Sequence, residues 1–476
     1  MTPENRRVLL VNPNRMQPPV APLALDYLAH ALRESRFEVD ILDLCFPGDP
    51  GEAVGDYFAR SRPLAIGVTL RNTDDTYFAS RDFFLPGFKG VIDSIRGHSR
   101  APLILGGAGF SVMPRAVLDF CGVDLGIWGE GEFALPMLLQ RMAAGDGYED
   151  VPGLIYPGKE GLVSNPPVYF PLGRVAPRRG AVDNLRYFRE GGMGAVEGKR
   201  GCPRACIYCA DPVGKGRRVR FRSPQSISAE IEALLEKGID HLHFCDSEFN
   251  IPEAHARRVC LELIERGLGE KVRWYTYASP VPFSDELAIL FRRAGCAGIN
   301  FGVDSGADTV LRALGRDFTA RDLERTAAIC HRQGIAFMYD LLLGGPGETM
   351  DTLRQTVESM KRLSPHRVGA SLGVRVFPGT RLASMVRRRG PLVGNPDLQG
   401  ELVGNDGLVA PVFYIASVLG PDPLGYLSNL VGGDERFFVG ARQGEDRNYN
   451  YNDNMVLVEA IRSGRRGAFW DILRFL

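Results

Sequence analysis

Three cysteines, Cys202, Cys206 and Cys209, lie in one short segment at the spacing CxxxCxxC. Three thiolates on one loop can hold three irons of a four-iron, four-sulfur (4Fe-4S) cluster and leave the fourth iron open. An open iron can bind a reactant, so the spacing indicates catalysis rather than electron storage alone. Zinc and a purely structural role are the alternatives. A structural zinc site wants a fourth ligand nearby, and the next Cys or His is His241.

The overall composition is that of an ordinary globular protein of two to four domains. Among 476 residues, Lys+Arg and Asp+Glu both total 57, so the net charge is zero. This balance argues against a general nucleic-acid or anionic-membrane binder. The sequence shows no long apolar run and no signal peptide, and its odd cysteine count of 9 suits a reducing compartment. We therefore expect a cytoplasmic protein with neither nucleic acid nor membrane as a partner.

The first segment, about 1–150, alternates short apolar strands with helical stretches, which predicts a doubly wound, Rossmann-like parallel sheet. Ligands of such sheets bind beyond the carboxyl ends of the strands, where glycine lets the backbone approach closely. A nucleotide would suit this face as well as any other ligand. The expected ligand contacts are Asn12, Pro13, Asn14, Leu70, Arg71, Asn72, Gly106, Gly107, Gly109, Phe110, Gly129, Glu130, Gly131 and Glu132.

The second segment, about 191–385, contains the cysteines and six predicted strands with helices between them. This pattern predicts a partial (β/α)6 barrel with its chemistry at the carboxyl ends of the strands. Residues 151–190 are rich in Pro, Gly and Arg, which predicts a linker with little structure of its own. Residues 386–476 are expected to form a small mixed cap domain. Its stretch 448–453 is rich in aromatic and amide side chains, and we expect substrate selectivity to lie in this domain.

The cysteine loop resembles that of the radical S-adenosylmethionine (SAM) superfamily. The first segment, through VNPN, GGAGFSVMP and GEGE, resembles the cobalamin-binding domain of the cobalamin-dependent members. The resemblance implies a 4Fe-4S cluster whose open iron binds SAM, an electron donor such as flavodoxin or ferredoxin, and bound cobalamin. The segment lacks the DxHxxG motif, and its histidines are His30, on a helix face, and His98, in a basic loop. Cobalamin is therefore expected base-off, with no histidine ligand.

The same resemblance assigns SAM contacts in the second segment. A carboxylate suits the ribose diol, and a guanidinium suits the SAM carboxylate. An aromatic residue is implied beside adenine, an acidic loop at the amino group, and a glycine turn at the adenine. Asp304 and Ser305 are assigned to the ribose and carboxylate, Arg316 to the SAM carboxylate and Tyr208 to the adenine. The acidic loop at the amino group consists of Asp246, Ser247 and Glu248, and the glycine turn consists of Leu343, Gly344 and Gly345.

The stretches LRNTDD and FFLPGF resemble the branch of this family that contains a tryptophan C2-methyltransferase. This resemblance implies that Arg71 lies on the lower face of cobalt without binding it. It also implies that Glu248 occupies the open cluster iron, which would keep SAM from chelating it. The alternatives are that Arg71 pairs with Asp74 or Asp75 and that Glu248 contacts SAM. We expect the route of most family members, in which each methylation releases one 5′-deoxyadenosine and one S-adenosylhomocysteine.

The function implied is methyl transfer from SAM, through methylcobalamin, to a carbon or other weakly nucleophilic centre. The expected substrate is a small or peptide-derived molecule of specialised metabolism. One alternative is a radical rearrangement, cyclisation or oxidation that uses the same cofactors. Another is a cobalamin-binding regulatory module, which would leave the cysteine loop without a role. An RNA methylthiotransferase would need further cluster cysteines.

Overall fold

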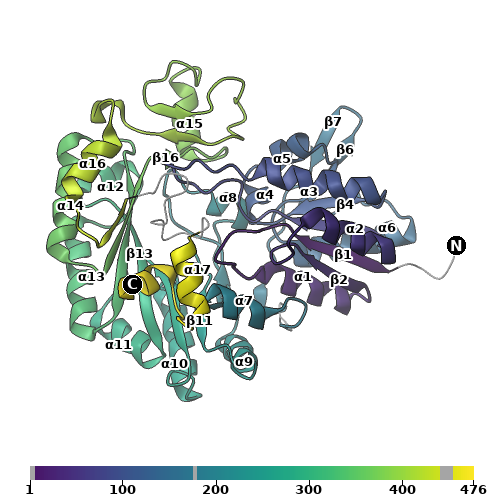
Figure 1. Cartoon of the computed structure of the whole chain (residues 1–476), viewed down its shortest axis with the longest axis horizontal. Coiled ribbons are helices and arrows are strands. Elements are labelled where there is room, and N and C mark those ends of the chain that lie inside the picture. Colours follow the sequence, from purple (N-terminus) through teal and green to yellow (C-terminus); the bar gives the residue numbers. More distant parts are fainter. Residues whose placement is uncertain (1–5, 175–178, 440–453) are drawn as a thin grey trace.

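The computed structural model describes residues 6–174, 179–439 and 454–476. Within them, two seven-stranded sheets form the framework. They lie side by side with the short helix α8 (Asp211–Lys215) between them (Figure 1). Among these described residues, no helix is both long and apolar enough to cross a membrane.

The N-terminal sheet has the strand order β2-β1-β3-β4-β5-β6-β7, and β1 to β5 are parallel. Alternate residues of β1 pack on opposite faces: Leu9 and Val11 belong to one apolar cluster, Val8 and Leu10 to the other. The sheet is therefore doubly wound, as predicted, and its order reverses between β1 and β3, where such sheets bind ligands. The strands are β1 (Arg7–Asn12), β2 (Glu38–Asp43), β3 (Ala65–Thr69), β4 (Leu103–Gly106), β5 (Leu125–Ile127), β6 (Leu154–Gly158) and β7 (Gly161–Ser164). The helices are α1 (Leu23–Glu34) and α6 (Gly131–Ala144) on one face, with α2 (Pro50–Arg60), α3 (Leu85–His98) and α5 (Pro114–Cys121) on the other.

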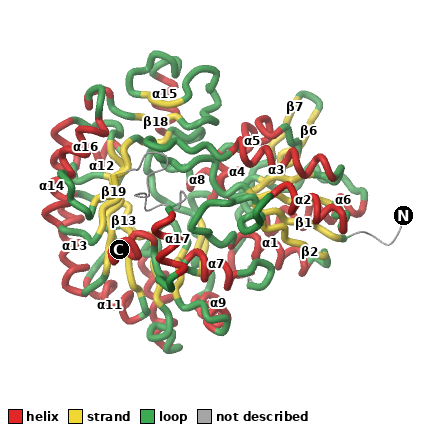
Figure 2. Tube along the Cα trace, in the orientation of Figure 1, coloured by secondary structure: helices red, strands yellow, loops and turns green. Residues whose placement is uncertain are grey.

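The second sheet is parallel throughout and has the order β19-β15-β14-β13-β12-β11-β8. Because strands consecutive along the chain are neighbours in space, with helices between them, the sheet is the predicted partial barrel. Figure 2 shows the helices on its outer side. The strands are β8 (Gly194–Val196), β11 (His241–Phe244), β12 (Arg273–Ala278), β13 (Cys296–Asp304), β14 (Ala336–Leu343), β15 (Arg367–Leu372) and β19 (Phe437–Val439). The helices are α9 (Pro224–Leu235), α10 (Glu253–Glu265), α11 (Asp285–Arg293), α12 (Asp308–Ala313), α13 (Ala320–Gln333) and α14 (Met350–Leu363).

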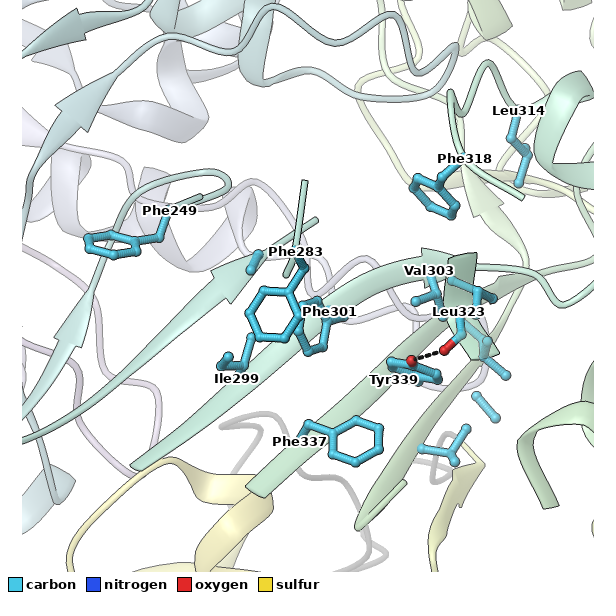
Figure 3. Close-up of a cluster of buried hydrophobic side chains, with 14 of the residues drawn as sticks. Phe249, Phe283, Ile299, Phe301, Val303, Leu314, Phe318, Leu323, Phe337 and Tyr339 are labelled. Carbon is cyan, nitrogen blue, oxygen red and sulfur yellow. Dashed lines mark hydrogen bonds between the residues drawn. The ribbon is translucent and has the colours of Figure 1, made fainter. Parts of the chain in front are cut away.

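The main core lies between the barrel strands and these helices (Figure 3). Aromatic rings dominate it, among them Phe301 and Phe337, which are fully buried. The Tyr339 hydroxyl donates to the carbonyl oxygen of Leu323 at 2.7 Å (Figure 3), so this polar group is also satisfied. Successive residues of a strand point to opposite faces, so the residues between these core positions face the inside of the barrel.

The prediction that 151–190 is a linker with little structure was wrong. Strands β6 and β7 extend the N-terminal sheet, and α7 (Asn184–Gly191) precedes β8. Leu154 and Ile155 are fully buried, and burying them favours pairing with β5 despite the nearby Pro and Gly. His98, expected in a loop, is the last residue of α3.

The residues after 385 do not form one separate cap. Strand β19 joins the barrel sheet. Strands β17 (Leu398–Gly400) and β18 (Val412–Tyr414) form a small antiparallel sheet with β16 (Val374–Arg375). Helix α17 (Met455–Arg462) packs on α7, and Trp470 of α18 (Phe469–Ile472) packs on Tyr275 of β12. The stretch 448–453 lies outside the described residues.

Candidate active site

The cysteine loop follows β8 and the short strand β9 (Lys199–Arg200). The amide of Cys202 donates to Gly216 O at 3.1 Å, and the amide of Ile207 donates to Leu314 O at 3.0 Å. The carbonyl of Ile207 in turn accepts from the amide of Leu382, in α15 (Arg381–Arg388), at 2.8 Å. These backbone contacts fix the loop from both sides, independently of its thiols.

The three loop thiols fit a cluster better than a single metal ion. None is in a disulfide, and burial raises the pKa of each. Arg316 Nη1 donates to Sγ of Cys206 at 2.9 Å, which favours a thiolate there. Among the described residues, no three Cys, His, Asp or Glu side chains converge on one ion-sized site. Thiolates that each bind a different iron need no such convergence.

Asp246 and Ser247, expected to bind SAM, hydrogen-bond to the segments that flank the cysteine loop, and their contact with SAM stays a prediction. The buried Asp246 accepts the amides of Gly198, at 2.7 Å, and Lys199, at 3.1 Å, through Oδ1. Ser247 Oγ donates to Oδ2 of Asp211 at 2.5 Å. The turn after β11 therefore holds the residues before and after the cysteine loop, and burial raises the pKa of the Asp246 carboxyl.

Glu248 lies beside the cysteine loop. Its carboxylate lies 3.1 Å from Arg204 Nε and 3.7 Å from Arg316 Nη2. Burial is the largest cause of the raised pKa of Cys202 and of Cys206, and the negative charge of Glu248 raises both pKa values further. The structure thus brings the two arginines and this carboxylate to the place where the cluster would be held.

Asp304, Tyr208 and Arg316, each expected at SAM, contact one another, and their contacts with SAM stay predictions. Tyr208 Oη donates to Asp304 Oδ2 at 2.7 Å, and Arg316 Nε lies 3.3 Å from the same oxygen. Ser305 does not share this geometry. Its hydroxyl lies 3.0 Å from Thr356 Oγ1 and accepts the amide of Ala307 at 3.1 Å, so it is an internal contact at the start of α12.

The predicted adenine turn, Leu343 to Gly345, packs closely against its neighbours. Gly344 has a φ of 82°, in the region that favours glycine, and its carbonyl accepts the amide of Ala416 at 2.8 Å. A Cβ on Gly345 would lie 2.9 Å from a side-chain atom of Leu314. The two glycines are therefore required by packing, and the contact with adenine stays a prediction.

The glycines after β4 also serve packing within the N-terminal sheet. Gly107 has a φ of 104°, and a Cβ there would lie 2.5 Å from Leu70 O. A Cβ on Gly109 would lie 2.9 Å from Arg71 O. The loop thus presses against the end of β3, next to Arg71 and Asn72. Phe110, expected to touch the cofactor, is fully buried in the apolar core instead.

In the Asn12-Pro13-Asn14 turn, the side chain of Asn12 hydrogen-bonds to other residues of the protein. Asn12 Nδ2 donates at 2.9 Å to both Asp43 and Tyr187, and Asn12 Oδ1 accepts the amide of Asn14 at 3.3 Å. The side chain of Asn12 is buried. The side chain therefore has a structural role at the end of β1, and the contact of Asn12 with a cofactor stays a prediction.

Glu130 and Glu132, also expected at the cofactor, form buried ion pairs between the domains. Glu132 Oε1 lies 2.5 Å from Arg200 Nη2, and Glu130 pairs with Arg220. Although burial opposes it, the charge of Arg200 lowers the pKa of Glu132. Gly129 and Gly131, which flank these acids, pack against other side chains. This GEGE stretch joins the first domain to the barrel.

Arg71 lies at the end of β3 and faces the barrel. Burial, and then the charge of Arg71, lower the pKa of His243 to about 4. Asp74, one partner suggested by the sequence, instead pairs with Arg375, with 3.0 Å between Oδ2 and Nη2. Arg71 is thus placed where the two domains face each other.

Two residues at this face were missed by sequence reasoning. His243 of β11 and Tyr277 of β12 have ring centroids 5.2 Å apart, and the Tyr277 side chain is 45% exposed. The polar-apolar alternation of HLHF was the available signal for His243, because it marks one face of the strand as different from the core face; WYTYA shows no such alternation.

Fold and site together define a radical SAM enzyme with a cobalamin-binding domain. The Radical SAM superfamily model matches residues 196–360, and the B12 binding domain model matches residues 14–139. A tryptophan 2-C-methyltransferase of Streptomyces laurentii is 36% identical over 442 residues, which cover 79% of this chain and 74% of the relative. The chain belongs to the family of cobalamin-dependent radical SAM methyltransferases that includes this enzyme.

Solved structures agree with this assignment. The radical SAM methyltransferase TsrM from Kitasatospora setae, with tryptophan and a SAM analogue bound, superposes with a TM-score of 0.92 at 32% identity. The match covers 99% of this chain and 97% of that one. A second TsrM structure, with cobalamin and a [4Fe-4S] cluster, gives 0.89 at 31% identity, with the same coverage. The cobalamin-dependent enzyme OxsB shares the fold at 18% identity, with a TM-score of 0.67 over 86% of this chain and 64% of that one.

The predicted family, enzyme class and methyltransferase function are confirmed. The enzyme uses a 4Fe-4S cluster, SAM and cobalamin. The regulatory module is set aside, because the chain belongs to a family of enzymes.

Proposed function

We propose that this enzyme methylates C2 of the indole ring of tryptophan or of a tryptophan-derived small molecule. The observation that carries the proposal is the match, over 99% of this chain, to a methyltransferase structure that holds tryptophan. The relative at 36% identity is a tryptophan 2-C-methyltransferase, in agreement with it. Indole carbons are weak nucleophiles, which is the kind of acceptor expected from the sequence.

When bound, SAM supplies the methyl group and cobalamin carries it. Arg71 would suit the lower face of that cofactor, because a guanidinium is always charged and has no lone pair to donate, so it would fill the space without acting as a ligand. We infer that cobalamin binds base-off, without a histidine ligand from residues 1–150.

The position of Glu248 favours polar methyl transfer over the radical route expected from the sequence. Arg204 and Arg316 hold the carboxylate beside the cysteine loop, where it could serve as the ligand of the iron that no cysteine would bind. A carboxylate at that iron would exclude the amino and carboxylate groups of SAM. The cluster would then serve electron transfer, with a small electron donor such as flavodoxin or ferredoxin as the partner, in the cytoplasm.

The test is anaerobic turnover of the reconstituted enzyme with SAM and tryptophan, followed by mass spectrometry and quantification of both nucleosides. The expected product is tryptophan with one added CH₂ at ring position 2, together with S-adenosylhomocysteine and no 5′-deoxyadenosine. Unchanged tryptophan would refute the substrate. Formation of 5′-deoxyadenosine in step with product would refute the polar route while leaving the substrate in place.

A further inference from the structure

The cysteine loop reaches the surface of the protein on its outer side. Cys202 is buried, but Pro203 and Ala205 are exposed, and both line a surface hollow of about 350 Å³. Asp317, an acid in this lining, is paired with Arg204. Electron transfer slows steeply with distance, so a protein that reduces a cluster held by this loop is best placed here. The other residues that line the hollow are Ile251, Val281, Pro282 and Gly315.

Two exposed arginines from different segments reach consecutive carbonyl groups of the cysteine loop. Arg217 Nη1 donates to the carbonyl oxygen of Arg204 at 3.1 Å. Arg381 Nη1, at the start of α15, donates to the carbonyl oxygen of Ala205 at 3.5 Å. A guanidinium has five N–H donors, so both arginines can bind a second protein while they contact the loop.

Helix α15 extends the positive charge along the surface beside the loop. Its exposed face carries Arg381, Arg387 and Arg388, and the helix has no acidic residue. Arg218, the neighbour of Arg217 in the chain, is also exposed. Figure 1 shows α15 at the periphery of the molecule, where a second protein can reach it. These five arginines form the basic surface, in a chain whose net charge is zero.

We propose that the basic surface and the hollow beside it are the docking site of the electron donor, a small acidic electron-transfer protein of the flavodoxin class; the inference rests on the proposed role of the cluster in electron transfer. The donor carries a reduced flavin that loses one electron, and the oxidised cluster gains it, with no bond made or broken. The five arginines attract the acidic surface of the donor and orient it toward the loop. The apolar lining of the hollow forms the centre of the contact and the arginines its charged rim, the usual anatomy of such interfaces.

The test measures binding and electron transfer separately in the reconstituted holoenzyme. Binding of oxidised flavodoxin is titrated at low and high salt. Reduction of the cluster is followed anaerobically with reduced flavodoxin or with photoreduced deazariboflavin, a small uncharged reductant that needs no docking surface. In Arg217→Glu/Arg381→Glu, the Kd for flavodoxin should rise on the order of tenfold or more at low salt, and reduction by flavodoxin should slow in parallel. The difference in Kd should shrink toward 1 M salt, where the Debye length falls to about 3 Å, and reduction by deazariboflavin should not change.

Two further double variants control for the loop contacts and for net charge. Arg218→Glu/Arg388→Glu reverses two charges of the basic surface and leaves Arg217 and Arg381 in place, so it should weaken flavodoxin binding in the same direction. Arg60→Glu/Arg100→Glu has the same net charge and should match the wild type. Both of its positions are exposed and precede β3 and β4, at the edge of the N-terminal sheet opposite the carboxyl ends of its strands. Iron content verifies that each variant holds its cluster.

The outcomes separate the docking site from the proposed function. Unchanged flavodoxin binding in both basic-surface variants, or an equal loss in Arg60→Glu/Arg100→Glu, would overturn the docking site alone. Equal slowing of reduction by flavodoxin and by deazariboflavin would also overturn it, because the arginines would then act on the cluster site itself. A wild-type enzyme that deazariboflavin reduces and that flavodoxin neither binds nor reduces would overturn the proposed electron donor as well, while leaving methylation of tryptophan in place.

Discussion

Arg316 donates a hydrogen bond from Nη1 to Sγ of Cys206, with 2.9 Å between the two atoms. The same guanidinium lies 3.3 Å from Asp304 and 3.7 Å from Glu248. One buried arginine therefore joins the cysteine loop to the two acids that sequence reasoning placed at SAM and at the open iron. Its charge favours a thiolate at Cys206 and attracts the carboxylate of Glu248, so the three groups are best understood as one unit.

The first prediction concerns Glu248. In Glu248→Gln the neutral amide is a weaker iron ligand than a carboxylate, so SAM should reach the open iron. We expect methylation to fall on the order of tenfold or more, because a charged contact is lost, and 5′-deoxyadenosine to appear during turnover. Chromatography of the nucleosides measures both. Asp317→Asn is the matched control, because Asp317 also pairs with Arg204 but is largely exposed. If both variants behave alike, Glu248 has no special role at the cluster.

The second prediction concerns the metal. Anaerobic reconstitution should give about four irons and four sulfides per wild-type chain and no cluster in the Cys202/Cys206/Cys209→Ala triple variant. The loop should keep its shape, because its fixing contacts are backbone hydrogen bonds. Iron, sulfide and zinc analysis decides the point, with Cys121→Ala, in the buried core of the N-terminal domain, as the control. Iron retained by the triple variant, or zinc in the wild type, would contradict the cluster assignment.

The third prediction concerns cobalt. The EPR spectrum of the Co(II) form should lack nitrogen superhyperfine splitting, because Arg71 rather than a donor nitrogen is placed at the end of β3. His243 is the histidine to control for, since its lowered pKa leaves the ring neutral and able to donate a lone pair. Splitting that disappears in His243→Phe would identify a histidine ligand from the barrel. Splitting that persists in that variant would identify the base of cobalamin itself.

Most of the correct predictions from the sequence rest on short, local patterns. The cysteine spacing and the strand-helix alternation are readable within short windows; the fold confirmed the alternation, and the relatives confirmed the cluster. Sequence reasoning missed the internal partners of Glu130, Glu132 and Ser305 for one reason. Their partners, Arg220, Arg200 and Thr356, are distant in sequence, so a polar residue at a strand end cannot be assigned to a ligand or to a neighbouring element without the fold.

The fourth prediction concerns pH. His255 is 1% exposed and packs against Phe221. Burial, and then the charges of Arg258 and Lys199, lower its pKa from 6.5 to about 4. Between pH 6.5 and about pH 4 the unfolded chain then binds a proton at His255 that the folded chain does not bind. The free energy of unfolding should therefore decrease as the pH is lowered through this range, by at most about 1.4 kcal/mol per pH unit for one proton. His255→Phe should lose less melting temperature than the wild type between pH 7 and pH 5. His98 is exposed, so His98→Phe should lose as much melting temperature as the wild type over this pH range. Equal losses of melting temperature in the wild type, His255→Phe and His98→Phe would exclude His255 as the cause.

The last prediction concerns the buried contact that joins the two domains. Arg179 lies 2.8 Å from Asp26 of α1 and 2.8 Å from Glu230 of α9, and all three side chains are at most 2% exposed. Its guanidinium also donates to Asn184. Removing one partner of a buried ion pair leaves an uncompensated charge, which costs about 3–5 kcal/mol. Arg179→Met should therefore lower the free energy of unfolding by about that amount, measured by urea titration with tryptophan fluorescence.

The matched control for Arg179→Met is Arg186→Met. Arg186 also forms an ion pair at 2.8 Å, with Glu190, but both side chains are more than a third exposed, and such pairs contribute at most about 1 kcal/mol. Glu230→Gln should resemble Arg179→Met, because it leaves Arg179 and Arg222 short of a counter-charge. The double variant Arg179→Met/Glu230→Gln should cost less than the sum of the two single variants, since the charges that each leaves unpaired partly disappear together. Additive losses, or an Arg179→Met variant no less stable than Arg186→Met, would show that the domains are held by their apolar contacts instead.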